Sequence, residues 1–394
     1  MNKLYTIVGA GQLGGMISYN LIKSGHKVRI IDAGDKLNRM NKQVPWGWFR
    51  KFSLQSKVKK SLMSEIFPEL DVKLDKTFGP MLLTSKNNKS IQIWQDWIKK
   101  NPETDSRVFL PQEACKTFNI SDDYFENNGG VYMCDTRDFM FDFSKLNNSI
   151  WDYLESDPNC EILSNCKLES INEKNKSLNT NKGELKYDKC LISIGNQSQY
   201  IIKDNYPKIN ITLPYSFVEN IPSRPYASIW NKDSSICYFN DGRIKLACGT
   251  QSILDLKQMN LTRCLNFANM GLNGLSNISF NVPNEVLINM AKNELKLLGY
   301  EDEINVDTIE SCDIDVTPTL CPYIYMIPET NIINIHGFSG SGSMIMDKNF
   351  INLVVDSLVN GKINKNLEVF APTKNIFRNN FVHNDKKTPL SSVV

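Results

Sequence analysis

The chain has 394 residues, of which 41% are hydrophobic and 22% are charged, and its formal net charge is +2. So small a balance, without a long basic run, gives no electrostatic case for nucleic-acid binding. The length and composition are those of a globular protein of roughly two domains, and no window approaches the ~20 apolar residues of a membrane-spanning helix.

The amino terminus lacks the long apolar stretch and small-residue cleavage site of a signal peptide. The ten cysteines are scattered, and no two of them form a C-x-x-C pair. Such thiols are expected to be reduced rather than joined in a disulfide framework or bound to zinc. We therefore expect a cytoplasmic protein without a metal site.

A β-α-β unit is predicted at the amino terminus. Residues 4–8 are a short apolar run of strand type, and residues 12–24 place apolar side chains at helical spacing before Gly25. Residues 27–32 are again strand-like, so the unit is complete within about thirty residues.

The loop inside this unit reads Gly9-Ala10-Gly11-Gln12-Leu13-Gly14, and all six residues are predicted to bind a dinucleotide. Gly9 permits the tight turn, Gly11 lets a pyrophosphate approach the backbone, and Gly14 lets the helix pack close to the strand. The helix N-terminus then offers N–H groups and a partial positive charge to phosphates.

Asp32 ends the second strand, where its carboxylate is placed to accept hydrogen bonds from a ribose, with Ala33 beside it. An acid here favours an unphosphorylated ribose, hence FAD or NAD. The loop alone does not separate these two cofactors, and a merely structural glycine turn is the simpler alternative.

The rest of the chain changes character twice. Residues 50–130 combine charged stretches and turn signals with a helix ending at Lys99 and Lys100, and strand patterns return over 161–195. The remaining predictions are strands around 236–250, a helix over 284–298, a last strand at 331–335, a glycine-rich loop, a helix over 345–360 ended by Gly361, and a polar tail after about 373.

Three further segments resemble the flavoprotein family of D-amino-acid oxidase, glycine oxidase and sarcosine oxidase. Residues 129–137 resemble the family's glycine pair followed by aspartate-x-arginine at the start of a helix. Residues 188–195 resemble the strand that brings the chain back under FAD. Gly337-Phe338-Ser339-Gly340-Ser341-Gly342 resembles the loop whose amides approach the pyrimidine end of the flavin.

The resemblance implies FAD as cofactor, and it implies that Leu168, Gly195 and the six residues 337–342 contribute to its site. Backbone N–H groups at the start of the 345–360 helix are expected to stabilise the negative charge of a reduced flavin.

Within the family, the likeness is greatest to the sarcosine oxidase branch. Gly47-Trp-Phe-Arg50 resembles its glycine-x-x-arginine beside the flavin, and Gly242-Arg-Ile-Lys245 resembles a strand whose lysine lies near flavin N5 and promotes reaction with oxygen. Residues 311–318 resemble the segment that holds a cysteine joined covalently to the flavin, which makes Cys312 a candidate attachment point.

Each of these residues also has a plainer interpretation. In these interpretations Arg50 stacks on an aromatic ring, Lys245 is a solvated lysine on a strand, and Cys312 is a small buried side chain. His336, before Gly337, is a candidate to polarise the flavin or the substrate, although packing at a strand end explains it more simply.

The chain departs from that branch at two positions. Ser53 and Met344 stand where the branch places an arginine and a lysine that bind the substrate carboxylate, and neither pairs with a carboxylate as a cation does. The expected substrate is therefore larger, esterified, carrier-bound or a plain amine, unless another cation serves. Candidate cations are Arg224, Lys51 and Arg243, and candidate pocket aromatics, equally explained by core packing, are Trp46, Trp48, Tyr215 and Phe217.

The predicted fold class is α/β (α+β overall): a Rossmann-like FAD-binding domain with a mostly parallel sheet, and an interleaved antiparallel-sheet substrate domain. The first is assigned to residues 1–50, 130–200 and 300–372, and the second to 51–129 and 201–299, before a polar tail at 373–394.

The expected function is FAD-dependent oxidation of the C–N bond of an amine or amino-acid-like substrate, by hydride transfer to flavin N5 with reoxidation by oxygen. The alternatives are a flavin monooxygenase reduced by NAD(P)H, a flavin-dependent dehydrogenase using another acceptor, an NAD-dependent dehydrogenase, and a non-catalytic flavin-bearing subunit.

Overall fold

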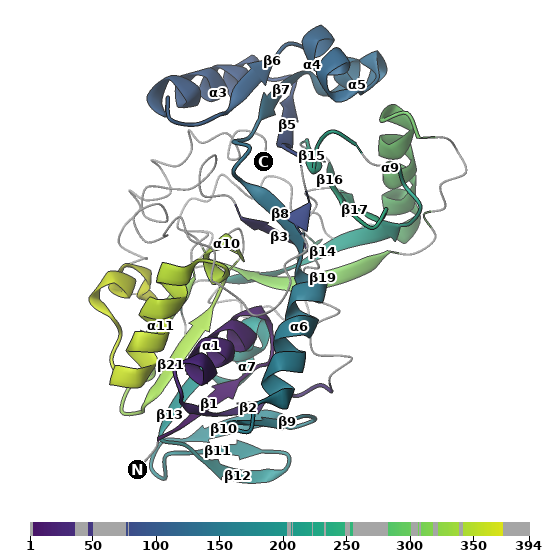
Figure 1. Cartoon of the computed structure of the whole chain (residues 1–394). Coiled ribbons are helices and arrows are strands. Elements are labelled where there is room, and N and C mark those ends of the chain that lie inside the picture. The colour runs from purple at the N-terminus through teal and green to yellow at the C-terminus, as the bar shows by residue number, and fades with distance from the viewer. Residues whose placement is uncertain are drawn as a thin grey trace.

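The computed structural model describes residues 3–35, 46–49, 76–77, 79–202, 206, 208–222, 224–231, 234–248, 253–254, 283–300, 306, 309–317, 322–338 and 342–372. Within these ranges the strands form four sheets, of six, nine, three and three strands. Figure 1 shows the six-stranded sheet and its helices at the lower end of the molecule and helices α3, α4 and α5 at the upper end.

The six-stranded sheet has the order β20-β21-β13-β1-β2-β9, and its strands pair in parallel except for β20. Such a sheet is covered on both faces, so its strands are apolar almost throughout. The strands are β1 (Leu4–Val8), β2 (Lys27–Ile31), β9 (Cys160–Leu163), β13 (Lys189–Ile192), β20 (Tyr323–Met326) and β21 (Ile332–His336).

Side-chain alternation divides the residues of this sheet between two cores. Ile7 and Leu191 pack with three helices on one face: α1 (Gln12–Lys23), α6 (Phe143–Ser156) and α11 (Lys348–Asn360). Val8 and Ile192 pack on the other face against a three-stranded sheet of β10 (Leu168–Asn172), β11 (Ser177–Thr180) and β12 (Gly183–Lys186).

The nine-stranded sheet is mostly antiparallel and also has two packed faces. Its strands are β5 (Met81–Ser85), β6 (Arg107–Phe109), β7 (Gly130–Met133), β14 (Ile209–Val218), β15 (Ser228–Trp230), β16 (Ser234–Tyr238), β17 (Ile244–Cys248), β18 (Ile253–Leu254) and β19 (Glu310–Val316). Ile236 and Leu246 face the helices α4 (Pro111–Phe118), α5 (Asp122–Asn128) and α9 (Asn284–Leu297). Met81 and Cys237 face the opposite way, toward α3 (Asn88–Lys100).

A second three-stranded sheet lies between these two layers: β3 (Trp46–Phe49), β8 (Phe139–Asp142) and β4 (Lys76–Thr77). The short helix α10 (Gly342–Ile345) packs against β3, and β8 leads directly into α6. The remaining short helices are η1 (Gly195–Gln197), α7 (Ser198–Ile201) and η3 (Lys365–Phe370).

The predicted fold class is confirmed, since a largely parallel sheet with helices is joined to a largely antiparallel one. The division into two domains stays a prediction. Strand pairing places β7, which follows residue 129, and β19, which follows residue 300, in the nine-stranded sheet rather than in the parallel one. No helix in these ranges is both long and apolar enough to cross a membrane.

The helix predicted over about 345–360 is present as α11, which begins three residues later than predicted, and the four-residue helix α10 precedes it. Asp347 lies between α10 and α11, has extended backbone dihedrals, and accepts a hydrogen bond from the N–H of Phe350 at 3.0 Å. A carboxylate in that position satisfies the first turn of α11 and starts a new helix. The predicted C-cap at Gly361 is confirmed by its left-handed conformation, with φ of 69°.

Candidate functional site

Four chain segments meet at one edge of the parallel sheet. Strands β1, β2, β13 and β21 end there, and Gly9, Asp32, Ser193 and Gly337 follow them directly. From β1 the chain continues to β2 on one side, whereas β13 and β21 lie on the other. In sheets of this type, ligands bind outside the carboxyl ends of the strands, at the point where the strand order reverses.

The glycines at positions 9 and 14 are required by close backbone packing. Gly9 has a φ of 98°, and a Cβ on it would lie 2.6 Å from the carbonyl oxygen of Ser193. A Cβ on Gly14 would lie 1.9 Å from the carbonyl oxygen of Gly9. The steric reasons predicted for glycine at both positions are therefore present, and cofactor binding at them stays a prediction.

The same loop presents its other predicted residues at the start of α1. Ala10 and Leu13 are buried, whereas Gly11 and Gln12 are partly accessible. Gly11 is the N-cap of α1 and has no side chain to cap the helix. The first turn of α1 also contains no acidic residue, so its partial positive charge is not offset by a neighbouring carboxylate within the helix.

Asp32 fixes the shape of the loop from the end of β2. Its Oδ2 accepts a hydrogen bond from the N–H of Ala10 at 2.7 Å, and its Oδ1 accepts one from Gly34 at 2.8 Å. A carboxylate has about four lone-pair positions, so its chemistry allows more than two hydrogen bonds. Ala33 is exposed beside it.

Gly337 brings the late glycine-rich loop against the end of β19. It has a φ of 82°, and a Cβ on it would lie 2.5 Å from Cγ2 of Thr317, which is fully buried. The sequence alone does not single out Thr317 or Ser193; each follows a strand directly, and the side of the sheet on which it ends is a tertiary property. The helix η1, which begins at Gly195 with a φ of 54°, also packs against β19 and β21.

Several predicted residues lie outside the described ranges. These are Arg50, Lys51, Ser53, Ser339, Gly340 and Ser341. Backbone positions are described for Cys312, opposite Leu213 of β14, and for Gly342, where α10 begins. Because α10 packs against β3, the structure places the strand before Arg50 beside the helix that follows the glycine-rich loop.

Two other predicted residues are apolar and have their side chains in the cores of the parallel sheet. Leu168 packs beneath Val8 and Ile31, and Phe338 packs against Phe350 of α11 with ring centroids 6.0 Å apart.

The predicted role of the 345–360 helix N-terminus stays a prediction. The first turn of α11 is bonded to the fully buried carboxylate of Asp347, which offsets its partial positive charge. The glycine-rich loop leads first into the four-residue helix α10, and α11 follows.

Lys245 is one of the most deeply buried side chains, which excludes the alternative of a solvated strand lysine. It is 1% exposed, in the middle of β17, opposite Phe217 of β14 and Cys237 of β16. Its Nζ lies 3.7 Å from the centroid of the Tyr215 ring. These residues share the face of the nine-stranded sheet turned away from α9, since Ile244 and Leu246 face that helix.

His336 ends β21 inside a group of aromatic rings. It is 1% exposed, and its ring centroid lies 5.5 Å from that of Tyr323 and 6.3 Å from that of Tyr325. Tyr206 contacts both tyrosines in turn. The structure is therefore consistent with packing at a strand end, and a polarising role stays a prediction.

The described cation candidates for a substrate carboxylate are engaged elsewhere. Arg224 donates to the hydroxyl of Tyr300 at 2.9 Å, on the α9 side of the sheet, away from Lys245. Arg243 pairs with Asp142 at 2.6 Å and with Asp241 at 2.9 Å.

Met344 stands where the resemblance to the sarcosine oxidase branch would place a lysine that binds the substrate carboxylate. Its side chain is fully buried in the core beside α1, α6 and α11. It therefore points into the protein interior rather than toward a site at the edge of the sheet. Of the described candidates, Arg224 and Arg243 are bonded to other groups, and Met344 carries no charge.

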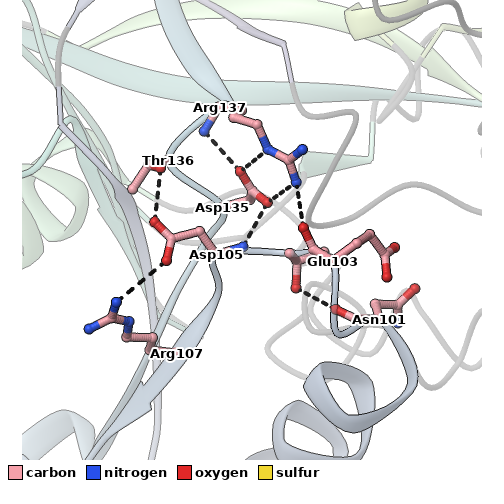
Figure 2. Close-up of polar contacts among 8 residues, drawn as sticks. Asn101, Glu103, Asp105, Arg107, Asp135, Thr136 and Arg137 are labelled. Carbon is pink, nitrogen blue, oxygen red and sulfur yellow. Dashed lines mark hydrogen bonds and ion pairs between the residues drawn. The ribbon is translucent and has the colours of Figure 1, made fainter.

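The aspartate-x-arginine segment forms a closed turn between β7 and β8, not the start of a helix (Figure 2). Arg137 donates to both carboxylate oxygens of Asp135, from Nε at 2.9 Å and from Nη2 at 2.6 Å. The N–H of Asp105 donates to the same carboxylate at 2.9 Å, and Arg137 also reaches the carbonyl of Glu103. This fully buried aspartate organises the turn that carries the chain from the nine-stranded sheet into β8 and α6.

Within the described ranges, no group of three or more His, Cys, Asp or Glu side chains is placed to hold a metal ion.

No protein-family model and no curated protein matches the sequence. Solved structures match it over nearly its whole length. L-proline dehydrogenase from P. horikoshii has a TM-score of 0.71 at 15% identity, covering 94% of this chain and 97% of that one. Glycine oxidase from Geobacillus kaustophilus has a TM-score of 0.70 at 14% identity, covering 94% and 99%.

Fructosyl amine:oxygen oxidoreductase (Amadoriase I) from Aspergillus fumigatus matches with a TM-score of 0.72 at 13% identity, covering 96% of this chain and 91% of that one. Identities this low carry information about fold rather than about substrate. The chain has the fold of these three oxidoreductases.

Proposed function

We propose that the chain is an FAD-dependent oxidoreductase that oxidises the C–N bond of an amine or amino-acid-like substrate, with oxygen as the electron acceptor. The observation that carries this proposal is the meeting of Gly9, Asp32, Ser193 and Gly337 at one edge of the parallel sheet. The structural neighbours are a proline dehydrogenase, a glycine oxidase and a fructosyl amine oxidoreductase, and they support the same reaction class.

The residues present fit the adenosine and pyrophosphate half of FAD. The first turn of α1 would face the pyrophosphate, and the turn at Gly9 allows the backbone to come close. Asp32, whose carboxylate is held at this edge by the N–H groups of Ala10 and Gly34, would accept hydrogen bonds from the adenosine ribose.

The flavin half would lie between the late glycine-rich loop and the nine-stranded sheet. Adjacent strands are about 4.8 Å apart, so Gly9 and Gly337, separated only by β13, follow strands roughly 10 Å apart at the same edge. Strand β19 begins at Glu310, opposite Tyr215, whose ring contacts Lys245, and is followed directly by Thr317, which lies against Gly337. One strand thus connects the glycine-rich loop to the buried lysine.

A bound flavin supplies a hydride acceptor at N5 and a route for electrons to oxygen, chemistry that no side chain provides. The protein would then have to orient the amine, exclude water and supply charge. Lys245 would place a positive charge in a water-poor environment, where it stabilises the negative charge that builds up on oxygen as it is reduced.

The substrate is proposed to be an amine that does not depend on a buried cation for its carboxylate. Arg224 and Arg243 are bonded to other groups, and Met344 faces the core. A larger, esterified, carrier-bound or plain amine fits this arrangement better than a small free amino acid, unless a residue such as Lys51 serves.

A flavin-dependent dehydrogenase with another acceptor is the second candidate, because the structural neighbours include a proline dehydrogenase as well as oxidases. The two differ only in how the reduced cofactor is reoxidised. Oxygen consumption therefore separates them.

The test begins with the absorbance spectrum of the purified full chain, which should show oxidised flavin. A panel of amines and amino acids, added without oxygen, should then bleach that colour, and admitted air should restore it. Bleaching by NADPH but by no amine would replace the proposal with a monooxygenase. Protein without flavin, or flavin that no donor reduces, would overturn it.

A further inference from the structure

Lys245 and Tyr215 form a buried contact between neighbouring strands of the nine-stranded sheet. Each side chain is 1% exposed, and the Nζ of Lys245 lies 3.7 Å from the centroid of the tyrosine ring. Phe217, directly opposite Lys245, has its ring 5.6 Å from that of Tyr215. The ammonium therefore lies over an aromatic face rather than in water.

This contact matters for the charge of the lysine. Removing an ammonium from water disfavours its charged form, and an aromatic ring face attracts a cation most strongly when both are desolvated. Tyrosine is among the better partners for such a contact. The ring of Tyr215 thus favours the protonated form that burial alone would disfavour.

Cys237, opposite Lys245 on β16, carries no negative charge. Burial raises the pKa of the Cys237 thiol to about 12, although the charge of Lys245 and a hydrogen bond with Trp230 act to lower it. The thiol is consequently neutral at physiological pH and supplies no negative charge from β16.

The backbone fixes Tyr215 in place from two sides. Strand β14 pairs with β17 through residues 216–218 and with β19 through residues 209–215. Tyr215 lies where these two pairings meet, opposite Glu310, and β19 continues from there to Thr317 beside the glycine-rich loop. Figure 1 shows β14 and β19 side by side between the two ends of the molecule.

We propose that Tyr215 is a positioning residue that holds Lys245 as an ammonium, with its charge directed to the flavin-facing side of the nine-stranded sheet. This inference rests on the proposed function for the flavin. It gives Tyr215 a role beyond that of a candidate pocket aromatic, and a reason for a tyrosine at this position of β14.

The first experiment is a double-mutant cycle on stability, which needs no cofactor. The free energy of unfolding in urea is measured for the wild type, Tyr215→Leu, Lys245→Met and the double variant. The two losses should be clearly non-additive, since either substitution alone removes the same contact. Tyr238→Leu, a buried tyrosine on the opposite face of the sheet, is the matched control and should add independently to Lys245→Met.

The second experiment reports on charge beside the flavin without turnover. Sulfite adds to flavin N5 as an anion, and the loss of visible absorbance gives its dissociation constant. We expect that constant to rise about tenfold in Tyr215→Leu and in Lys245→Met, with no further rise in the double variant. Tyr215→Phe keeps the ring face and should bind sulfite within about threefold of the wild type.

The failures of the two proposals are distinguishable. Protein that binds no flavin overturns the proposed function, and the stability cycle still judges the pairing. Additive stability losses, or a Tyr215→Leu variant that binds flavin and sulfite as the wild type does, overturn the role of Tyr215 while leaving the flavoprotein assignment intact.

Discussion

Gly9, at the carboxyl end of β1, lies against the backbone of Ser193, at the carboxyl end of β13. The carbonyl oxygen of Ser193 is 2.6 Å from the position of a Cβ on Gly9, and the φ of Gly9 is 98°. Two chain segments more than 180 residues apart thus close the turn over which a dinucleotide would lie.

Gly9→Ala should lower the free energy of unfolding by about 2–4 kcal/mol, because it combines an unfavourable φ with an overpacked contact. The matched control is Gly183→Ala, which has a similar φ of 110° but nothing within 4 Å of the added methyl group. The free energy of unfolding of that variant should fall by only about 1 kcal/mol. Urea unfolding checks both values, and equal losses would show that the approach to Ser193 is not restrictive.

Asp32→Asn should weaken the turn and, with it, the retention of flavin. The substitution exchanges one acceptor oxygen for an NH₂ group facing a backbone N–H, and a cost of about 1–3 kcal/mol is expected. Asp188→Asn is the control, since Asp188 accepts a single exposed bond from Leu4 at the other end of β1. Flavin content after gel filtration is the readout, and unchanged content in Asp32→Asn would argue against a ribose contact.

Gly337→Ala should destabilise the protein through a clash with Thr317, and the substitution Thr317→Ser should relieve that clash. The added methyl group would lie 2.5 Å from Cγ2 of Thr317. Thr317→Ser deletes that carbon, so the double variant should recover part of the roughly 1–3 kcal/mol lost to overpacking. Gly25→Ala, with a φ of 80° and open space around it, measures the backbone strain alone. Thermal unfolding of the four variants decides whether the two segments touch.

Asp135→Asn should destabilise the chain by about 2 kcal/mol near neutral pH, since an uncharged NH₂ group replaces the oxygen that accepts from Asp105 N–H and Arg137 Nη2. Burial acts to raise the pKa of Asp135, but these hydrogen bonds prevail and lower it below the ordinary value. A group whose pKa is depressed by folding stabilises above its unfolded pKa, and this contribution is lost as the pH falls through the folded one.

The difference in unfolding free energy between the wild type and Asp135→Asn should therefore shrink below about pH 4. Urea unfolding across the acid range gives this profile. A difference that stays constant with pH would mean that the turn in Figure 2 does not depend on the charge of Asp135.

Cys312 gives a prediction about cofactor attachment. If its thiol is joined to the flavin, acid-precipitated wild-type protein stays yellow, whereas Cys312→Ala releases its colour to the supernatant. Cys115→Ala, at a partly exposed cysteine elsewhere in the chain, serves as control and should remain yellow. Wild-type protein that releases all its flavin on precipitation would show that attachment is non-covalent.

The parts of this protein that were predictable from sequence are local. Strand β1, the glycine turn, α1 and β2 follow from periodicity and from the steric demands of Gly9 and Gly14, all within thirty-two residues. The amphipathic helices α3 and α9 were equally readable, because their spacing repeats over three turns or more. The start of α11 was predicted three residues early because the apolar pattern continues across Asp347, whose cap to Phe350 begins the helix.

Amino-acid sequence by itself thus determined the β-α-β unit, the need for glycine at its turns and the character of each segment, because short-range sterics and periodicity act between near neighbours. Tertiary structure decided which sheet received β7 and β19, that Arg224 faces away from Lys245, and that Lys245 rests on Tyr215. These depend on strand partners distant in sequence, and a strand's partner determines which side chains share its face.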